Sequence, residues 1–235
     1  MLRTEFPIVG LGASGGGIQA LEAFFRGMPL NPGMAFVVVS HLSSGHEQHL
    51  LDAIARHTSL AVMIGVDNQQ LEPNCVYLLP RDALMSIGQR RLRVIKRPAN
   101  LSVRRPVDLF FSALAQDCLD YAAGVVLSGG NSDGTLGIKA IKEYGGLTMA
   151  QATDEDGPVN PEMPASAIAS GWVDFALPAS EMARKLANVE GVFAGMSSGG
   201  AASAAIRLAK ELDAGVIVFI VCDRGDRYLS SSLFG

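Results

Sequence analysis

The feature that most constrains the fold is an alternation of short apolar runs with longer segments of helical period. The apolar runs lie at residues 8–11, 36–39, 61–64, 75–79, 124–127 and 147–150, and the helical patterns at 18–25, 47–56, 107–116, 135–144 and 164–170. Strands that alternate with helices predict parallel β-α-β units. Runs such as FVVV and GVVL are apolar throughout, which indicates burial on both faces. We therefore expect an α/β fold: a doubly wound, mostly parallel sheet in a Rossmann-like α/β/α sandwich.

Composition and charge exclude several classes of partner. The 235 residues are 49% hydrophobic with a formal net charge of −4, so the chain can bury a core but has no positive field for nucleic acid. No run approaches the roughly 18–20 apolar residues of a membrane span, and the N-terminus does not resemble a signal peptide. Three cysteines without a CxxC pair indicate a reducing compartment. We expect a cytoplasmic protein with no membrane insertion and no nucleic-acid partner.

A glycine-rich turn, GLGASGGG, follows the first predicted strand. Gly10, Gly12 and Gly15 match the spacing of a dinucleotide loop, but no acidic residue ends the second strand, and the lysine of a P-loop is absent. Nucleotide binding is therefore disfavoured. The small residues instead indicate that Ser14 is presented on a sharp strand-to-helix turn, as in a nucleophile elbow. The amides of Gly15 and Gly16 would then face a developing oxyanion, whereas the competing interpretation makes Ser14 only a helix cap.

Two further strand ends supply the partners that a nucleophilic serine needs. His41 comes after the second strand and is placed to accept the serine proton, then return it to the leaving group. Asp133 is the only acid in the loop GGNSDG after the strand at 124–127, where it could orient the imidazole or merely cap the next helix. His46 and His49 have metal-pair spacing, but no carboxylate or cysteine cluster accompanies them. We therefore predict a Ser14, His41, Asp133 triad and no metal.

Five segments carry a resemblance to a known family: GASGGG, SHLSSGHEQHLLDAIARHT, RRPVDLFFSALA, SGGNSDGTLG and EMPASAIASGWVDFALP. In collinear order over about residues 5–188, they resemble the catalytic domain of the chemotaxis-type protein-glutamate methylesterase (CheB) family. The resemblance implies hydrolysis of glutamate γ-methyl esters on methylated chemoreceptor helices, with methanol released. It also implies deamidation of selected glutamines by the same route, and no metal or organic cofactor.

Three positions depart from the pattern of that family. Gly15 stands where threonine is usual, and the loop usually written GMGxDG here has Gly130 and Asn131 at its second and third positions. Backbone donors need no side chain, so we expect the amide of Gly130 to join Gly15 and Gly16 in the oxyanion hole. The alternative function is a catalytically weak or silent interaction domain of a chemotaxis-type signalling protein, which binds a partner helix or a methyltransferase. Retention of all three triad residue types favours the enzyme.

The last 47 residues, 189–235, follow a different pattern. The run from GVFAGMSSGG to RGDRYLS resembles the carboxyl end of cysteine synthase, a pyridoxal-phosphate enzyme, in which a serine matching Ser197 or Ser198 contacts the cofactor. No upstream lysine lies in a Schiff-base context, so we expect no such cofactor. The two resemblances predict a chimera with a catalytic domain at 1–188 and a helix-strand tail at 189–235. Because an open apolar strand at 216–221 would be an adhesive edge, the tail should pair with the sheet or with a second chain in a homodimer.

Overall fold

The computed structural model describes residues 6–40, 47–97, 105–153 and 157–188. The chain divides into two units, residues 1–190 and 191–235, and the second lies wholly outside the described residues. The predicted helix-strand tail and its pairing with a sheet or a second chain therefore stay predictions. All of the described residues belong to the first unit.

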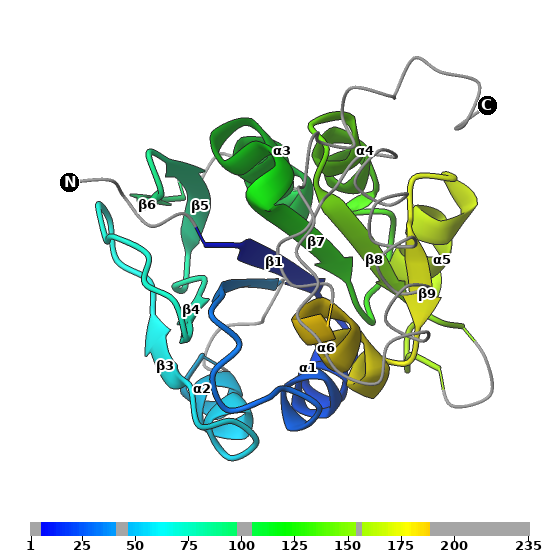
Figure 1. Cartoon of the computed structure of the whole chain (residues 1–235), viewed down its shortest axis with the longest axis horizontal. Helices are drawn as coiled ribbons and strands as arrows, with labels where there is room; N and C mark the ends of the chain where they lie inside the picture. Colours follow the sequence, from blue (N-terminus) through cyan, green and yellow to red (C-terminus); the bar gives the residue numbers. More distant parts are fainter. Residues whose placement is uncertain (1–5, 41–46, 98–104, 154–156, 189–235) are drawn as a thin grey trace, which may run out of the picture. The chain divides into compact units, whose positions relative to one another are not determined.

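A seven-stranded sheet, parallel at every strand pair, forms the centre of this unit (Figure 1). Its strand order is β3-β4-β2-β1-β7-β8-β9. The strands are β1 (Ile8–Ala13), β2 (Ala35–Ser40), β3 (Ala61–Ile64), β4 (Cys75–Leu78), β7 (Ala122–Val126), β8 (Leu147–Gln151) and β9 (Phe175–Leu177). β1, β7 and β8 are buried at every position, as predicted for apolar runs such as GVVL, and in β8 the polar Thr148 and Gln151 are buried as well. The predicted doubly wound α/β fold is confirmed.

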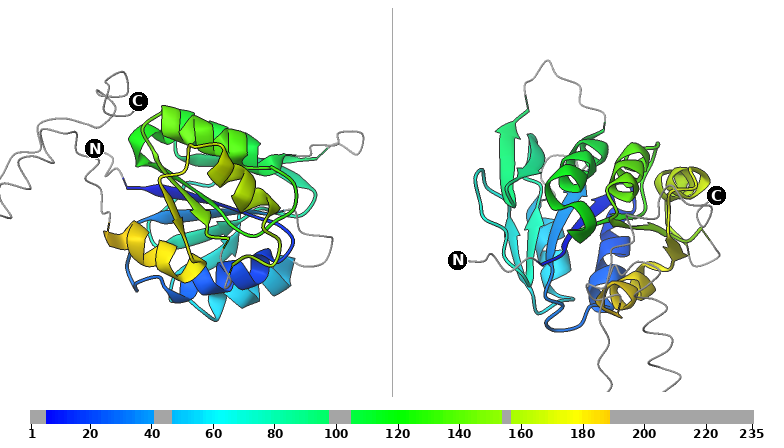
Figure 2. Two further views of the ribbon diagram at one scale, coloured as in Figure 1. Left: turned by 90° about the vertical axis from the view of Figure 1, so that its right-hand side faces the viewer. Right: turned by 45° about the horizontal axis from the view of Figure 1, so that its top comes forward.

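Helices cover both faces of the sheet (Figure 2). One face carries α1 (Gly17–Arg26), α2 (Glu47–Ala55) and α6 (Ala179–Asn188), and the other carries α3 (Pro106–Cys118), α4 (Thr135–Glu143) and α5 (Glu162–Ala169), with a short 3₁₀ helix, η1 (Leu119–Tyr121), after α3. α3 begins with proline at its first position, where no amide hydrogen is needed. Within the described ranges, no helix combines the length and apolar character that crossing a membrane requires.

A two-stranded antiparallel sheet lies beside the main one and consists of β5 (Ala83–Gly88) and β6 (Arg91–Lys96). The apolar patterns at 84–87 and 91–95 predict a hairpin with Gly88 and Gln89 in its turn. The hairpin is confirmed, but its turn lies one residue later, because Gly88 still pairs with Arg91. Gln89 and Arg90 occupy the turn with positive φ, a conformation that favours glycine or asparagine. The carboxylate of Asp117 on α3 accepts the amides of both residues, which stabilises this turn from outside the hairpin.

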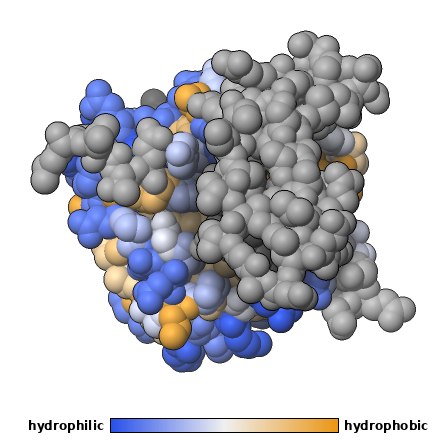
Figure 3. All heavy atoms as spheres, viewed as in Figure 1, coloured by the Kyte–Doolittle hydropathy of each residue, from blue (hydrophilic) through white to orange (hydrophobic). Residues whose placement is uncertain are grey.

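α3 packs closely against β1. A Cβ on Gly10 would lie 2.7 Å from the Phe111 ring, and one on Gly12 would collide with Val107, so these two glycines allow the helix to approach the strand. Phe111 is completely buried, and each such phenylalanine contributes about 1.5–3 kcal/mol through burial. On the surface drawn in Figure 3, hydrophilic side chains are prominent among the described residues, with hydrophobic ones scattered between them.

The direction of strand addition reverses at β1. The chain passes from β1 to β2 on one side, and later crosses to β7 on the other side. At the carboxyl ends, Ala13 of β1 is in register with Ser40 of β2, and Gly12 with Val126 of β7. In sheets of this kind, ligands bind at the switch point beyond the carboxyl ends of the strands. A functional site is therefore expected in the segments that follow β1, β2 and β7.

Candidate active site

Ser14 lies at this switch point, directly after β1. Its amide donates to the carbonyl of Ser128 at 2.8 Å, and its own carbonyl accepts the amide of Gly17, the first residue of α1, at 2.7 Å. Gly16 has a φ of 77°, in the left-handed region that glycine adopts at least cost. The turn is thus fixed by backbone contacts on both sides of Ser14, whose side chain is half-buried.

The segment after β7 packs closely against the serine. A Cβ on Gly129 would lie 2.8 Å from the Cβ of Ser14, so only glycine fits there without displacement. The hydroxyl of the preceding Ser128 donates to the carbonyl of Gly15 at 2.8 Å and accepts the amide of Asn160 at 3.0 Å. Ser128 therefore ties together three segments that are distant in sequence: the turn after β1, the loop after β7, and the approach to α5.

Three backbone amides near Ser14 are available as donors. Among the described residues, the amides of Gly15, Gly16 and Gly130 donate to no acceptor, whereas the amide of Gly17 is paired. Gly15 is exposed, and Gly16 and Gly130 are partly exposed, so a bound substrate could approach them. Unpaired amides at the start of a helix are suited to stabilise negative charge.

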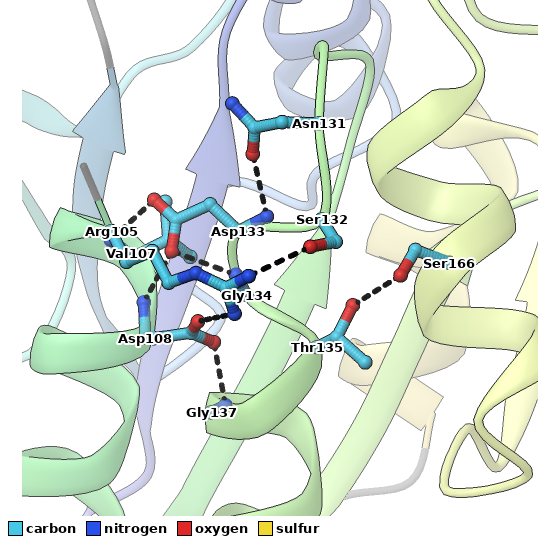
Figure 4. Close-up of polar contacts among 10 residues, drawn as sticks. All are labelled: Arg105, Val107, Asp108, Asn131, Ser132, Asp133, Gly134, Thr135, Gly137 and Ser166. Atoms are coloured by element: carbon cyan, nitrogen blue, oxygen red, sulfur yellow. Dashed lines mark hydrogen bonds and ion pairs between the residues drawn. The ribbon is translucent and has the colours of Figure 1, made fainter.

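Asp133 is completely buried, and its carboxylate holds the start of α3 (Figure 4). Its Oδ2 accepts the amide of Val107 at 3.0 Å, and its Oδ1 accepts the amides of Asp108 and Gly134, each at 2.9 Å. The cap residue of α4 is Gly134, so Asp133 acts mainly on a helix that begins 27 residues earlier in the chain. A carboxylate can accept about four hydrogen bonds, so Asp133 can hold these amides and orient an imidazole as well.

A second buried acid, Asp108, supports this arrangement. It accepts the amide of Gly137 at 2.8 Å through Oδ1, and the guanidinium of Arg105 lies 3.3 Å from Oδ2 (Figure 4). Burial raises the pKa of Asp108, and the nearby charge of Asp133 raises it further, while the contacts with Gly137 and Arg105 oppose the shift. Asp108 thereby links the first turns of α3 and α4, the two helices that meet at Asp133.

His41, the predicted base, lies outside the described residues, as does His46. The strand that precedes His41 ends at Ser40, whose register partner Ala13 precedes Ser14. In the described ranges, no group of three or more histidine, cysteine, aspartate or glutamate residues is placed to hold a metal ion. The structure thus brings Ser14 together with the segment that leads to Asp133, and the role of His41 stays a prediction.

Two polar residues at the site were not predicted from sequence. Ser128 directly follows β7, so the rule that singled out Ser14 at the end of β1 would also have found it. Asn160 has no such signal, because it lies in an irregular segment between β8 and α5. Its backbone amide donates to the hydroxyl of Ser128, and its carbonyl accepts the amide of Gly129. Both partners lie about 30 residues earlier in the chain, so no local pattern predicts these contacts.

Fold and site together define a doubly wound α/β protein with a serine and a buried carboxylate on neighbouring segments at its switch point. The family model described as CheB methylesterase matches residues 9–186. The chain therefore belongs to the CheB methylesterase family, as the sequence resemblance predicted.

Relatives and a solved structure agree with this assignment. A protein-glutamate methylesterase/protein-glutamine glutaminase of Paramagnetospirillum magneticum is 35% identical over 80% of the chain. The one from Thermotoga maritima is 30% identical over 76% of the chain. The chain spans about half the length of these curated relatives, 53% in each case. The crystal structure of the Thermotoga maritima CheB methylesterase catalytic domain superposes with a TM-score of 0.71 at 27% identity, over 79% of this chain and all of that one.

Proposed function

We propose that this chain is a protein-glutamate methylesterase, a carboxylic ester hydrolase that acts on glutamate γ-methyl esters in methylated chemoreceptor helices. The observation that carries the proposal is the position of Ser14 at the switch point, beside the amides of Gly15, Gly16 and Gly130, which have no acceptor in the described structure. The names of the relatives support both the ester substrate and a second activity on glutamine. Ser14, His41 and Asp133 form the proposed triad.

In the first half of the reaction, the hydroxyl oxygen of Ser14 attacks the ester carbonyl carbon while His41 takes the hydroxyl proton. Negative charge develops on the carbonyl oxygen and is stabilised by the neighbouring glycine amides. The carbon–oxygen bond to the methoxy group then breaks. His41 gives its proton to that oxygen, methanol leaves, and the glutamyl group stays esterified to Ser14.

In the second half, water attacks the acyl-enzyme as His41 takes one of its protons. The bond to Ser14 breaks, Ser14 regains a proton from His41, and the product is a glutamate side chain. A glutamine substrate follows the same route with ammonia as the leaving group. Asp133 orients the imidazole and stabilises its protonated form, so the route needs neither a metal nor an organic cofactor.

The silent interaction domain is the weaker proposal, since family membership and the names of the relatives favour an enzyme. A methyltransferase partner and a cytoplasmic location are compatible with either proposal and are inferred from the sequence. The chimeric origin and the homodimer are also inferred from the sequence. Both depend on residues 189–235, which lie outside the described part of the chain. The similarity of this tail to the carboxyl end of cysteine synthase is likewise proposed from the sequence.

Mass spectrometry of receptor-helix peptides tests the proposed substrate class. One peptide carries a glutamate γ-methyl ester and a second carries glutamine at the same position. We expect the first to lose the mass of one CH₂ group and the second to gain the mass difference between an amide and an acid. A folded protein that changes neither peptide, but retains them on a binding column, would favour the interaction domain instead.

A further inference from the structure

Asn160 is fixed beside the proposed oxyanion hole by its backbone. Its amide donates to the hydroxyl of Ser128 at 3.0 Å, and its carbonyl accepts the amide of Gly129 at 2.9 Å. The carbonyl of Ser128 also accepts the amide of Ser14, and Gly129 packs against the Ser14 side chain. Any displacement of Asn160 would therefore disturb the contacts around the serine, and its position is set by the same segment.

The side chain of Asn160 has a defined orientation. Its Oδ1 lies 3.4 Å from the amide of Glu162, the first residue of α5, which is a local cap two residues further along the chain. That contact directs Nδ2 away from α5 and toward the glycines. A Cβ on Gly130 would lie 3.2 Å from Nδ2, and a Cβ on Gly15 would lie 3.6 Å from it. In the described structure Nδ2 donates to no acceptor.

We propose that Asn160 is a further catalytic residue, whose side-chain N–H donates to the oxyanion together with the backbone amides of Gly15 and Gly130. This inference rests on the proposed esterase function. A neutral, fixed donor that faces the developing charge stabilises the transition state more than the uncharged ester, so it raises the turnover rate rather than substrate affinity.

The two glycines fit this role. A side chain at Gly15 or Gly130 would begin at ordinary or tight contact distance from Nδ2 and would fill the space beside this donor. The residue after Gly130 is also held in place, because the carboxylate of Glu162 accepts the amide of Asn131 at 2.7 Å. Gly15 and Gly130, which lack the side chains usual in the resembled family, are therefore the two residues next to the Asn160 side-chain amide.

Two variants separate a donor from a simple helix cap. Asn160→Ala removes both functions, and we expect kcat for methyl-ester hydrolysis to fall by roughly 10²–10³-fold, as for other side-chain oxyanion donors, with KM little changed. Asn160→Asp keeps an acceptor for the start of α5 and adds a charge that favours a helix N-terminus. It replaces the donor with an anionic oxygen, so we expect a melting temperature at or above that of the wild type and a kcat at or below that of Asn160→Ala.

The outcomes distinguish this inference from the proposed function. Wild type that releases methanol, with Asn160→Asp folded and within a few-fold of the wild-type kcat, would overturn the donor role and leave the esterase intact. A raised KM at unchanged kcat would overturn it as well. A folded wild type that releases no methanol would overturn the esterase and the donor role together. If Asn160→Ala does not fold, Asn160→Asp decides between these results.

Discussion

The carboxylate of Asp133 accepts the backbone amide of Asp108 at 2.9 Å across 25 residues of chain. Through this contact and the adjacent one to Val107, a buried acid in the loop after β7 holds the first turn of α3. α3 in turn packs on β1, the strand that ends at Ala13, directly before Ser14. The proposed orienting acid is therefore part of the framework that positions the proposed nucleophile.

Replacing the acid at Asp133 should affect both stability and turnover. Asp133→Asn keeps the size of the side chain but places an NH₂ group against an amide donor, either that of Val107 or those of Asp108 and Gly134. We expect a loss of about 1–3 kcal/mol in the free energy of unfolding, together with loss of methanol release. Urea denaturation and steady-state kinetics measure the two effects.

Asp67→Asn is the matched control, because the Asp67 carboxylate accepts one amide, that of Val94, at 2.9 Å in an exposed setting. This variant should retain its activity and lose little stability. Equal stability and equal activity of the Asp133 and Asp67 variants would contradict the framework role of Asp133.

The dependence of stability on pH should report Asp108. Because burial raises its pKa, the folded protein keeps a proton on Asp108 in a pH interval that starts at about 4, where the unfolded chain has released it. The contribution of Asp108 to the free energy of unfolding therefore falls as pH rises through that interval. Asp108→Asn removes this titration, so the stability of the wild type relative to the variant should decline from pH 4 upward. Parallel curves would contradict the prediction.

Close packing at Gly129 should make it intolerant of any side chain. In Gly129→Ala, the new methyl group would lie 2.8 Å from the Cβ of Ser14 and would collide with the sulfur of Met163. We expect a loss of about 1–3 kcal/mol in stability and a larger loss of turnover, because the strain falls on the serine. Gly88→Ala is the control, since its nearest neighbour would be 3.8 Å away. Retention of full activity by Gly129→Ala would show that the serine is not constrained from this side.

The pH–rate profile tests His41 as the general base. A base must be neutral to accept the proton of Ser14, so kcat/KM should rise with pH through an apparent pKa of about 6.5. His41→Gln should abolish this activity. His57→Gln, which alters a histidine 3.8 Å from Glu22, should leave the profile unchanged. A wild-type rate that does not vary between pH 5 and 9 would rule out a histidine base.

The sequence predicted most of the sheet because β1, β2 and β7 are largely apolar runs, and β8 is interrupted only by Thr148 before its last residue, Gln151. It did not predict β9, which has three residues, none of them buried, or α6, which follows it. The hairpin turn was misplaced by one residue because Gly88 is the obvious turn former, whereas Asp117 stabilises the strained Gln89-Arg90 pair from another element.

At the site, strand ends were informative and loops were not. Ser14 and Asp133 follow apolar strands, and a polar residue at that place is visible in the sequence. The groups that Asp133 contacts are not visible in the sequence. Its carboxylate accepts amides at the start of α3, whereas the sequence suggested the next helix, α4. Asn160 likewise depends on contacts with Ser128 and Gly129 that no local pattern encodes.

Methanol release from methyl-esterified receptor helices, compared between wild type, Ser14→Ala and Ser170→Ala, tests the central claim most directly. Ser170 is the control because its hydroxyl makes only local contacts among the described residues: it donates to the carbonyl of Ala167 at 2.6 Å and accepts the amide of Trp172 at 3.3 Å, at the end of α5. The account predicts release by the wild type and by Ser170→Ala, and none above the uncatalysed rate by a folded Ser14→Ala. Undiminished release by Ser14→Ala would contradict the assignment of Ser14 as the nucleophile.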